Sequence, residues 1–205
     1  MDLPIDWLLK GDPWVAYRAR LELLCEPETS PAVLQDRAAM LADPRLLAIV
    51  TELAGWPVER LNSHKSAGHP LHKLVFLADL GLKADDPGMA LIIERVMEHP
   101  ADTGPFQVLM NISPHFGGTG EDVWAWAPCD APLILYALIQ FGLGSDERVR
   151  KGVDYLVGLC FANGWRCTPS PELGKFRGPG KKEDPCPFAN LIMLKTLALL
   201  PEYTD

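Results

Sequence analysis

Helix-start signals recur along the whole sequence, and they constrain its fold more than any other feature. Four times, a residue that can cap a helix stands directly before a proline: Asp12-Pro13, Ser30-Pro31, Asp43-Pro44 and Asp86-Pro87. Serine and aspartate accept a hydrogen bond from the first turn of a helix, and proline is tolerated at its first position. Glycine follows apolar runs, as it does where helices end, at three points: Gly81, Gly142 and Gly144. Because no stretch sustains an alternation of apolar and polar residues, the pattern predicts an all-α chain without strands.

Two segments of the chain align with each other at an offset of 61 residues, which matches Leu74 with Leu135. Each contains an apolar helix, a glycine, an acidic cap, a second helix and a closing glycine with an aromatic residue. Helix pairs of this kind cannot bury their apolar faces alone and must stack. We therefore interpret residues 1–205 as a single helical-repeat domain, with units at about 12–56, 69–106 and 130–165 and a terminal helix at 187–200.

The repeated unit resembles the helical hairpin of the α/α-toroid proteins, which include protein prenyltransferases and squalene or terpene cyclases. The likeness rests on Leu-x-x-Leu-Gly-Leu-x-x-Asp at residues 77–85, an amphipathic helix, and the turns at 163–165 and 103–106. It covers roughly residues 12–200. The resemblance implies an α/α helical-hairpin repeat that forms a partial α/α toroid and binds an apolar, isoprenoid-like ligand. A partial ring of this size would be completed by forming a homo-oligomer.

The charge balance narrows the range of partners. Nineteen Lys and Arg residues against 27 Asp and Glu give a net charge of −8. This excess of acids argues against a duplex nucleic-acid binder and against electrostatic docking on an anionic membrane. The first residues carry acids where a signal peptide needs positive charge, and no apolar run approaches the roughly 20 residues of a membrane span. The expected location is cytoplasmic.

Cysteines stand where the inner helices of a toroid would begin. Cys129 and Cys186 precede two such helices, His69 precedes a third, and Cys167 follows the turn at 163–165. Protein prenyltransferases hold zinc with an Asp and a Cys at one inner helix and a His at a later one. The resemblance therefore implies a Zn²⁺ site with the ligands Cys129, Cys167 and Cys186, completed by His69 or Asp130. Ordinary thiols, a disulfide and an iron–sulfur cluster remain open alternatives.

The two other cysteines of the chain, Cys25 and Cys160, are interpreted as small buried apolar side chains.

Asp130 is the one acid placed where a catalytic proton donor is expected. The chain has neither the Asp-x-Asp-Asp motif of squalene-type cyclases nor an Asp-Asp-x-x-Asp motif for magnesium diphosphate. A basic segment follows later, and we interpret it as a clamp for a diphosphate cofactor or substrate, as in prenyl-transferring enzymes, or else as a solvated loop: Lys175, Arg177, Lys181 and Lys182. Trp124 and Trp126 either line a ligand cavity or pack between repeats.

Two functions follow. The first is a zinc-dependent, transferase-like enzyme that acts on an apolar, isoprenoid-like substrate. The second is a non-catalytic scaffold that binds an apolar small molecule or a protein partner, with structural cysteines. The missing acid motifs and the short ring favour the second.

Overall fold

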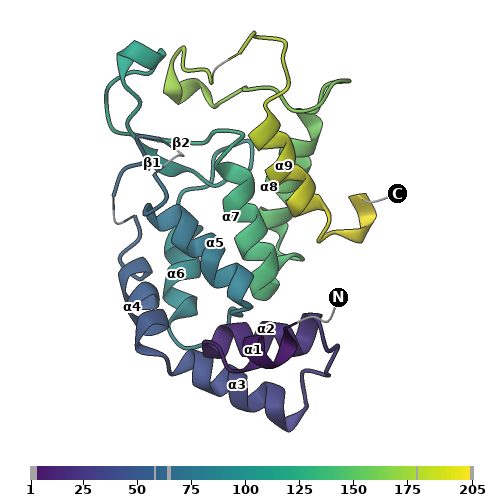
Figure 1. The fold of residues 1–205 in the computed structure, drawn as a ribbon. Coiled ribbons are helices and arrows are strands. Elements are labelled where there is room, and N and C mark those ends of the chain that lie inside the picture. The colour runs from purple at the N-terminus through teal and green to yellow at the C-terminus, as the bar shows by residue number, and fades with distance from the viewer. Residues whose placement is uncertain (1–3, 58, 64–65, 179, 204–205) are drawn as a thin grey trace. The chain divides into compact units, whose positions relative to one another are not determined.

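The computed structural model describes residues 4–57, 59–63, 66–178 and 180–203. The chain divides into two compact units, Met1–Glu52 and Leu53–Asp205. Its described part is mostly helical, which confirms the all-α class (Figure 1). No helix in that part has the length and apolar character that crossing a bilayer requires. The single domain remains a prediction.

The first unit is built from short helices: α1 (Ile5–Leu9), α2 (Pro13–Glu22), α3 (Pro31–Leu41) and α4 (Pro44–Leu53), which ends at the first residue of the second unit. Helix α2 packs against both α1 and α3. The predicted cap at Ser30 is present, because its side chain accepts a hydrogen bond from the backbone N–H of Val33. Arg20 on α2 pairs with Asp36 on α3 at 2.7 Å and so fixes the two helices to each other.

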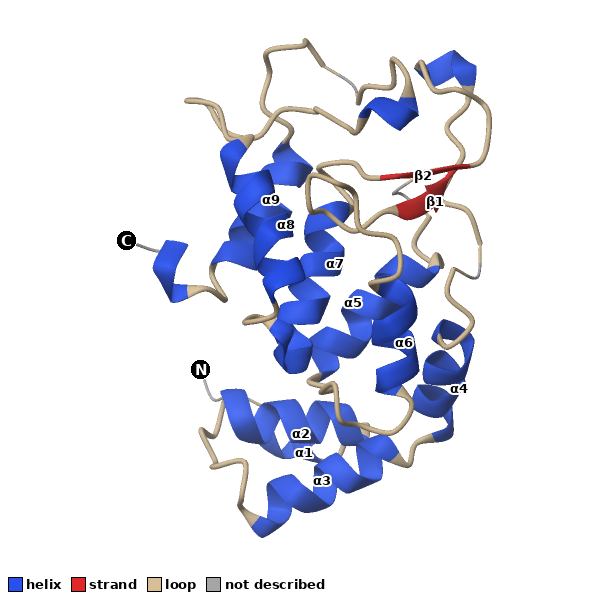
Figure 2. Ribbon diagram, turned by 180° about the vertical axis from the view of Figure 1, so that it is seen from behind, coloured by secondary structure: helices blue, strands red, loops and turns tan. Residues whose placement is uncertain are grey.

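The second unit is organised around one completely buried helix. Its helices are α5 (Pro70–Leu80), α6 (Met89–Val96), α7 (Ala131–Leu138), α8 (Glu147–Gly158) and α9 (Pro187–Leu197). Helix α7 packs against α5, α8 and α9, and all of its residues are buried (Figure 2). Short helical turns complete the unit: η1 (Pro114–Phe116), η2 (Ile139–Leu143), η3 (Pro171–Leu173) and η4 (Pro201–Tyr203).

Several predicted helix boundaries agree with the structure. Helix α5 ends at Gly81, whose φ of 92° is left-handed, and the α7–η2 helix reaches Gly142 with a φ of 100°. Glycine adopts this conformation without the steric cost that a Cβ imposes. The start predicted at Asp86-Pro87 is displaced, because α6 begins at Met89 after Gly88. The Asp86 carboxylate instead accepts a hydrogen bond from the backbone N–H of Lys83.

The prediction that the chain has no strands is wrong. Strands β1 (Val108–Met110) and β2 (Val123–Ala125) form an antiparallel pair in which Val108 faces Ala125. Leu61 joins this ribbon, because its N–H donates to the carbonyl of Leu109 at 2.8 Å. Strands of three residues are too short to produce an alternating pattern, so the sequence carries no periodic signal for them.

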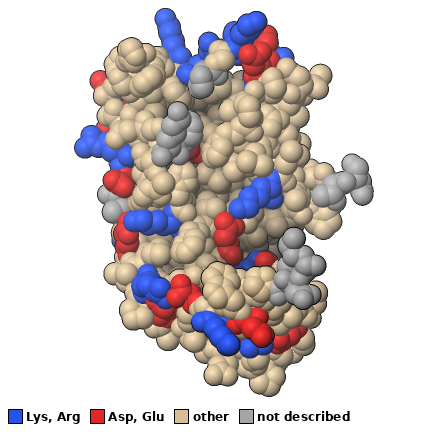
Figure 3. Space-filling model, in the orientation of Figure 1, with Lys and Arg blue, Asp and Glu red and all other residues tan. Residues whose placement is uncertain are grey.

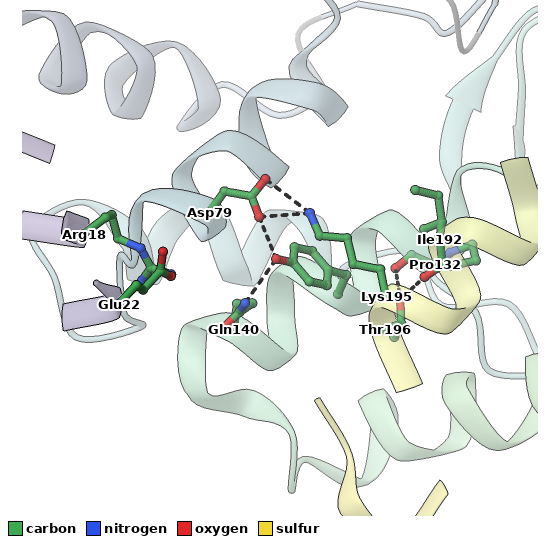
Figure 4. A network of polar contacts seen from close by, with 9 residues as sticks. Arg18, Glu22, Asp79, Pro132, Gln140, Ile192, Lys195 and Thr196 are labelled. Atoms are coloured by element: carbon green, nitrogen blue, oxygen red, sulfur yellow. Dashed lines mark hydrogen bonds and ion pairs between the residues drawn. The ribbon is translucent and has the colours of Figure 1, made fainter. Parts of the chain in front are cut away.

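A polar network fastens α5, α7 and α9 together (Figure 4). The Tyr136 hydroxyl on α7 donates to Asp79 on α5 at 2.6 Å, and the Lys195 ammonium on α9 lies 3.0 Å from the same carboxylate. Gln140 donates to the Tyr136 hydroxyl at 3.1 Å. The Lys195 ammonium also lies 4.0 Å from the centre of the Tyr136 ring. One carboxylate thus links three helices that are distant in the sequence.

Replacement of Tyr136 by phenylalanine is expected to lower the free energy of unfolding by about 1–2 kcal/mol, because Asp79 loses the hydrogen bond that the Tyr136 hydroxyl donates. The matched control is Tyr203→Phe, since the Tyr203 hydroxyl also donates to a carboxylate, that of Asp154, but at an exposed position. Urea denaturation of both variants gives the comparison. Equal losses for the two variants would contradict the stabilising role of the network.

Candidate functional site

Asp130 occupies the N-cap position of α7 but does not cap the helix through its side chain. The residue is 3% exposed, and its carboxyl Oδ2 accepts a hydrogen bond from the Cys129 thiol at 3.4 Å. The other oxygen, Oδ1, is buried and has no hydrogen-bond partner among the described residues. Burial disfavours the charged form and raises the pKa of Asp130 from 3.8 to about 7. The group therefore retains a proton over much of the range below neutral pH.

A pocket of about 400 Å³ opens beside this carboxyl group. Asp130 and Cys129 lie on its wall, together with Arg177. Most of the remaining wall is apolar: Leu61, Met110, Ile112, Phe116 and Phe176. A site with an apolar lining and a few convergent polar groups is typical of small-molecule binding.

Loops that are far apart in the sequence form the walls of this pocket. The backbone N–H of Lys175 donates to the carbonyl of Gly117 at 2.8 Å, so the segment after η3 is joined to the turn after η1. Gly120 donates to the carbonyl of Ile112 at 2.9 Å and closes that turn. The segment around Leu61 forms the third wall, and the hydrogen bond from the Leu61 N–H to β1 holds it in place. Sequence reasoning missed these apolar residues, because each loop has a separate irregular sequence with no periodic signal.

The three predicted cysteines and Asp130 lie close enough together for a charge on one of them to shift the pKa of another. Burial raises the pKa of the Cys129 thiol well above its ordinary range, and negative charge on Asp130, Cys167 or Cys186 would raise it further. Burial also raises the pKa of Cys167, partly offset by a 3.0 Å hydrogen bond from the backbone N–H of Gly178. Cys186 is the N-cap of α9, and its own N–H donates to the carbonyl of Trp165 at 2.8 Å. Burial thus keeps the Cys129 and Cys167 thiols protonated at neutral pH.

His69 is not available to complete a zinc site in this structure. Its Nδ1 accepts a hydrogen bond from the backbone N–H of Leu71 at 3.1 Å and so caps α5. The other ring nitrogen, Nε2, therefore carries the proton and donates to the carbonyl of Glu59 at 3.2 Å. Both nitrogens are thus used, and burial lowers the pKa of the ring, which favours this neutral form.

No group of three or more His, Cys, Asp or Glu side chains within the described ranges is arranged to hold a metal ion. The zinc site that the cysteines predict is therefore without support in this geometry. The interpretation of the remaining cysteines as buried is wrong, because both are exposed: Cys25, in a left-handed turn with a φ of 52°, and Cys160, directly after the C-cap of α8.

Only some of the basic residues predicted to bind a diphosphate line a pocket. Lys175, Arg177 and Lys182 line a second pocket of about 430 Å³, together with Arg166. Lys181 is exposed and does not line this pocket; its backbone N–H donates to the Asp184 carboxylate at 3.0 Å.

The two tryptophans pack against other rings and do not line the pocket beside Asp130. The Trp124 ring stacks on His99 with 3.5 Å between the ring centres. Trp126 is 4% exposed and meets the Tyr155 ring edge-on at 5.7 Å. These contacts favour the packing interpretation of both side chains.

Comparisons of the chain with protein-family models, curated proteins and solved structures find no match.

Proposed function

We propose that the chain binds an apolar, isoprenoid-like molecule in the pocket beside Asp130, and that Asp130 donates a proton to it in a terpene-cyclase-like step. The observation that carries this proposal is the buried Asp130 carboxyl, whose Oδ1 has no partner among the described residues, on the wall of a mostly apolar pocket. An acid with a pKa of about 7 is protonated below neutral pH and has a proton to give.

Proton transfer to a hydrocarbon requires a site from which water is excluded, and the apolar walls of the pocket provide such a site. Protonation of a carbon–carbon double bond creates a carbocation, which water would capture at once. Apolar side chains such as Leu61, Ile112 and Phe116 exclude water from the space beside the acid. After proton transfer, the Asp130 carboxylate remains close to the cation and lowers its energy, while Cys129 donates a hydrogen bond to Oδ2.

The proposal extends to the arrangement of the helices. We infer that α5 with α6 and α7 with α8 are successive hairpins of a partial α/α toroid, with α9 as the first helix of another hairpin. The support is their common order: an apolar helix, a left-handed glycine at Gly81 or Gly142, and a second helix. Gly104 and Gly164 follow at corresponding positions, with φ values of 118° and 102°.

A metal takes no part in this proposal, because no group of three or more His, Cys, Asp or Glu side chains among the described residues is arranged to hold one. The zinc-dependent transferase expected from the resemblance would use Cys129, Cys167 and Cys186 as ligands, completed by His69 or Asp130. The hydrogen bonds of His69 use both of its ring nitrogens.

The alternative is a non-catalytic scaffold that binds an apolar molecule or a protein partner. The role of Cys167 favours it, since this thiol accepts a hydrogen bond from Gly178 and so supports a loop. In this alternative the cysteines are structural and Asp130 performs no proton transfer.

Deuterium transfer distinguishes the two functions. We expect the wild-type protein to bind geraniol, as measured by calorimetry, and to introduce solvent deuterium into it in D₂O, as measured by mass spectrometry. Asp130→Asn should retain binding but slow deuterium uptake by about a hundredfold or more, because it has no acidic proton. Asp102→Asn, at an exposed acid, is the matched control and should behave as wild type.

Binding without deuterium uptake by the wild-type protein would favour the scaffold. Undiminished uptake by Asp130→Asn would exclude Asp130 as the donor, and absence of binding would remove the isoprenoid-like ligand.

A further inference from the structure

Two thiols, those of Cys167 and Cys186, flank a segment that forms part of the pocket beside Asp130. Both thiols are free and partly exposed. The 18 residues between them include Phe176 and Gly178, which line that pocket. Figure 3 shows several Lys and Arg side chains at the upper edge of the view, where the chain between α8 and α9 lies in Figure 1. The segment that the two cysteines flank is therefore part of the molecular surface.

Backbone hydrogen bonds hold the two cysteines beside each other. Arg166 and Pro185 form an antiparallel bridge, and the N–H of Cys186 donates to the carbonyl of Trp165 at 2.8 Å. Cys186 therefore lies opposite Trp165, and Cys167, two residues beyond Trp165, lies on the same face as a diagonal neighbour of Cys186. Burial raises the pKa of Cys167, and negative charge on Cys186 adds to this effect, which agrees with their proximity.

Asn190 on α9 fixes this arrangement. Its Nδ2 donates to the carbonyl of Trp165 at 2.9 Å and to the carbonyl of Cys186 at 2.8 Å. Its Oδ1 accepts a hydrogen bond from the N–H of Trp165 at 3.1 Å. One amide side chain thus joins the segment after α8 to the start of α9, and it keeps Cys186 next to the residues around Trp165.

The Cys167 sulfur also holds a part of the pocket wall. It accepts a hydrogen bond from the backbone N–H of Gly178 at 3.0 Å, and Gly178 lines the pocket beside Asp130. Diagonal neighbours of an antiparallel pair have Cα atoms about 7–8 Å apart, whereas a disulfide requires at most about 6.8 Å. A disulfide with Cys186 would therefore draw Cys167 away from Gly178, whose N–H would lose its acceptor.

We propose that Cys167 and Cys186 form a reversible disulfide, and that its formation releases Gly178 and opens the wall of the pocket beside Asp130. The oxidant is a low-molecular-weight disulfide. It reaches Cys167 through the second pocket, because Cys167 lines that pocket. The consequence for an apolar ligand rests on the proposed function, whereas formation of the disulfide does not.

Two thiol–disulfide exchange steps account for all atoms and electrons. One protein thiol loses its proton to water and attacks the oxidant, so that a mixed disulfide forms and the S–S bond of the oxidant breaks. The second protein thiol, deprotonated in the same way, then attacks the protein sulfur of the mixed disulfide. The two thiolates that leave take up the two protons. The protein dithiol is thus oxidised by two electrons, and the oxidant is reduced to two thiols.

Oxidation by glutathione disulfide at about pH 8, where thiols begin to ionise, tests the proposal. After alkylation of the remaining thiols, trypsin places the four cysteines of the second unit in different peptides, and mass spectrometry should show peptide 167–175 linked to peptide 183–195. Cys160→Ser is the matched control and should form the same link, because Cys160 is exposed and precedes the paired segment. Cys186→Ser should lack the link and still fold, since serine is a preferred N-cap for a helix such as α9.

Two measurements on the same samples follow the pocket wall. In the oxidised protein, the Gly178 amide should exchange with solvent about tenfold faster, as measured by NMR, because its hydrogen bond is lost. The affinity for geraniol, measured by calorimetry, should fall about tenfold. Reduction with dithiothreitol should restore both values.

A link from Cys129 to either cysteine, or no link within the chain, would overturn the proposed pair. Unchanged exchange of the Gly178 amide in the linked protein, or unchanged geraniol affinity, would overturn the effect on the pocket wall. If the reduced protein does not bind geraniol, the proposed apolar ligand fails, whereas the link and the Gly178 exchange still decide this inference.

Discussion

Replacement of Asp130 by asparagine is expected to stabilise the protein by up to about 4 kcal/mol above neutral pH and to leave it nearly unchanged at about pH 4. The pKa of Asp130 is about 7 in the folded protein, against an ordinary value of 3.8. At about 1.4 kcal/mol per pH unit, this interval corresponds to about 4 kcal/mol. The neutral amide of asparagine avoids the cost of burying a charge.

The direction of the pH dependence follows from the raised pKa. Between about pH 4 and about pH 7 the folded protein keeps a proton on Asp130 that the unfolded chain has lost. Stability from this group is therefore complete below about pH 4, falls as the pH rises, and reaches its minimum above about pH 7. Urea denaturation across this range should give a difference between Asp130→Asn and wild type that grows with pH.

Asp122→Asn is the control with the opposite sign. The Asn111 side chain donates to the Asp122 carboxylate at 2.6 Å and, with Arg60, lowers the pKa of Asp122. That carboxylate stabilises the fold above its ordinary pKa and loses this effect as the pH falls. Its replacement should therefore reduce stability near neutral pH. A difference between Asp130→Asn and wild type that did not change with pH would contradict the raised pKa of Asp130.

Replacement of Gly118 by alanine is expected to destabilise the second unit by about 3 kcal/mol and to weaken ligand binding in the pocket beside Asp130. An added Cβ would lie 2.1 Å from the carbonyl oxygen of Ile112 and 2.6 Å from its carbonyl carbon. Backbone atoms cannot move aside as the end of a flexible side chain can. The loop that runs from Ile112 through η1 to Gly120 must then shift, and it carries Phe116 and Ile112, which line the pocket.

Gly158→Ala is the matched control, because a Cβ at Gly158 meets no atom within 4 Å. This glycine is the last residue of α8, where alanine is a better helix former, so the variant should be neutral or stabilised by up to about 1 kcal/mol. Thermal denaturation and calorimetry with geraniol give both readouts. If Gly118→Ala unfolded and bound geraniol as wild type does, the close packing of this turn against Ile112 would be refuted.

The helical framework was largely predictable because its signals are local. Caps such as Ser30 and stops such as Gly81 act through hydrogen bonds and backbone angles within a few residues. The same local rules failed where contacts beyond the nearest residues decide the outcome. The ribbon of β1 and β2 pairs segments across an irregular loop, and Asp86 turns back to Lys83 instead of starting α6.

The candidate site was predictable in its residue types but not in its arrangement. Cys129, Asp130, Cys167 and Cys186 stand at helix starts and turns, and burial and the last three all raise the pKa of the Cys129 thiol, but no group of such side chains among the described residues is arranged to hold a metal. His69 is different, because its bonds to Leu71 and Glu59 use both ring nitrogens. No spacing in the sequence shows how many hydrogen bonds a side chain already makes.

The sequence by itself determined that this chain is mostly helical and that chemically active side chains precede α7 and α9. Only the tertiary structure decided that Asp130 is buried, that loops around Leu61, Ile112 and Phe176 enclose a pocket beside it, and that Phe176 also lines the second pocket. Helix signals depend on neighbouring residues, whereas burial, pKa and charge neutralisation depend on atoms brought together from distant parts of the chain. The proton on Asp130 and the gathering of cations around the second pocket belong to that second kind.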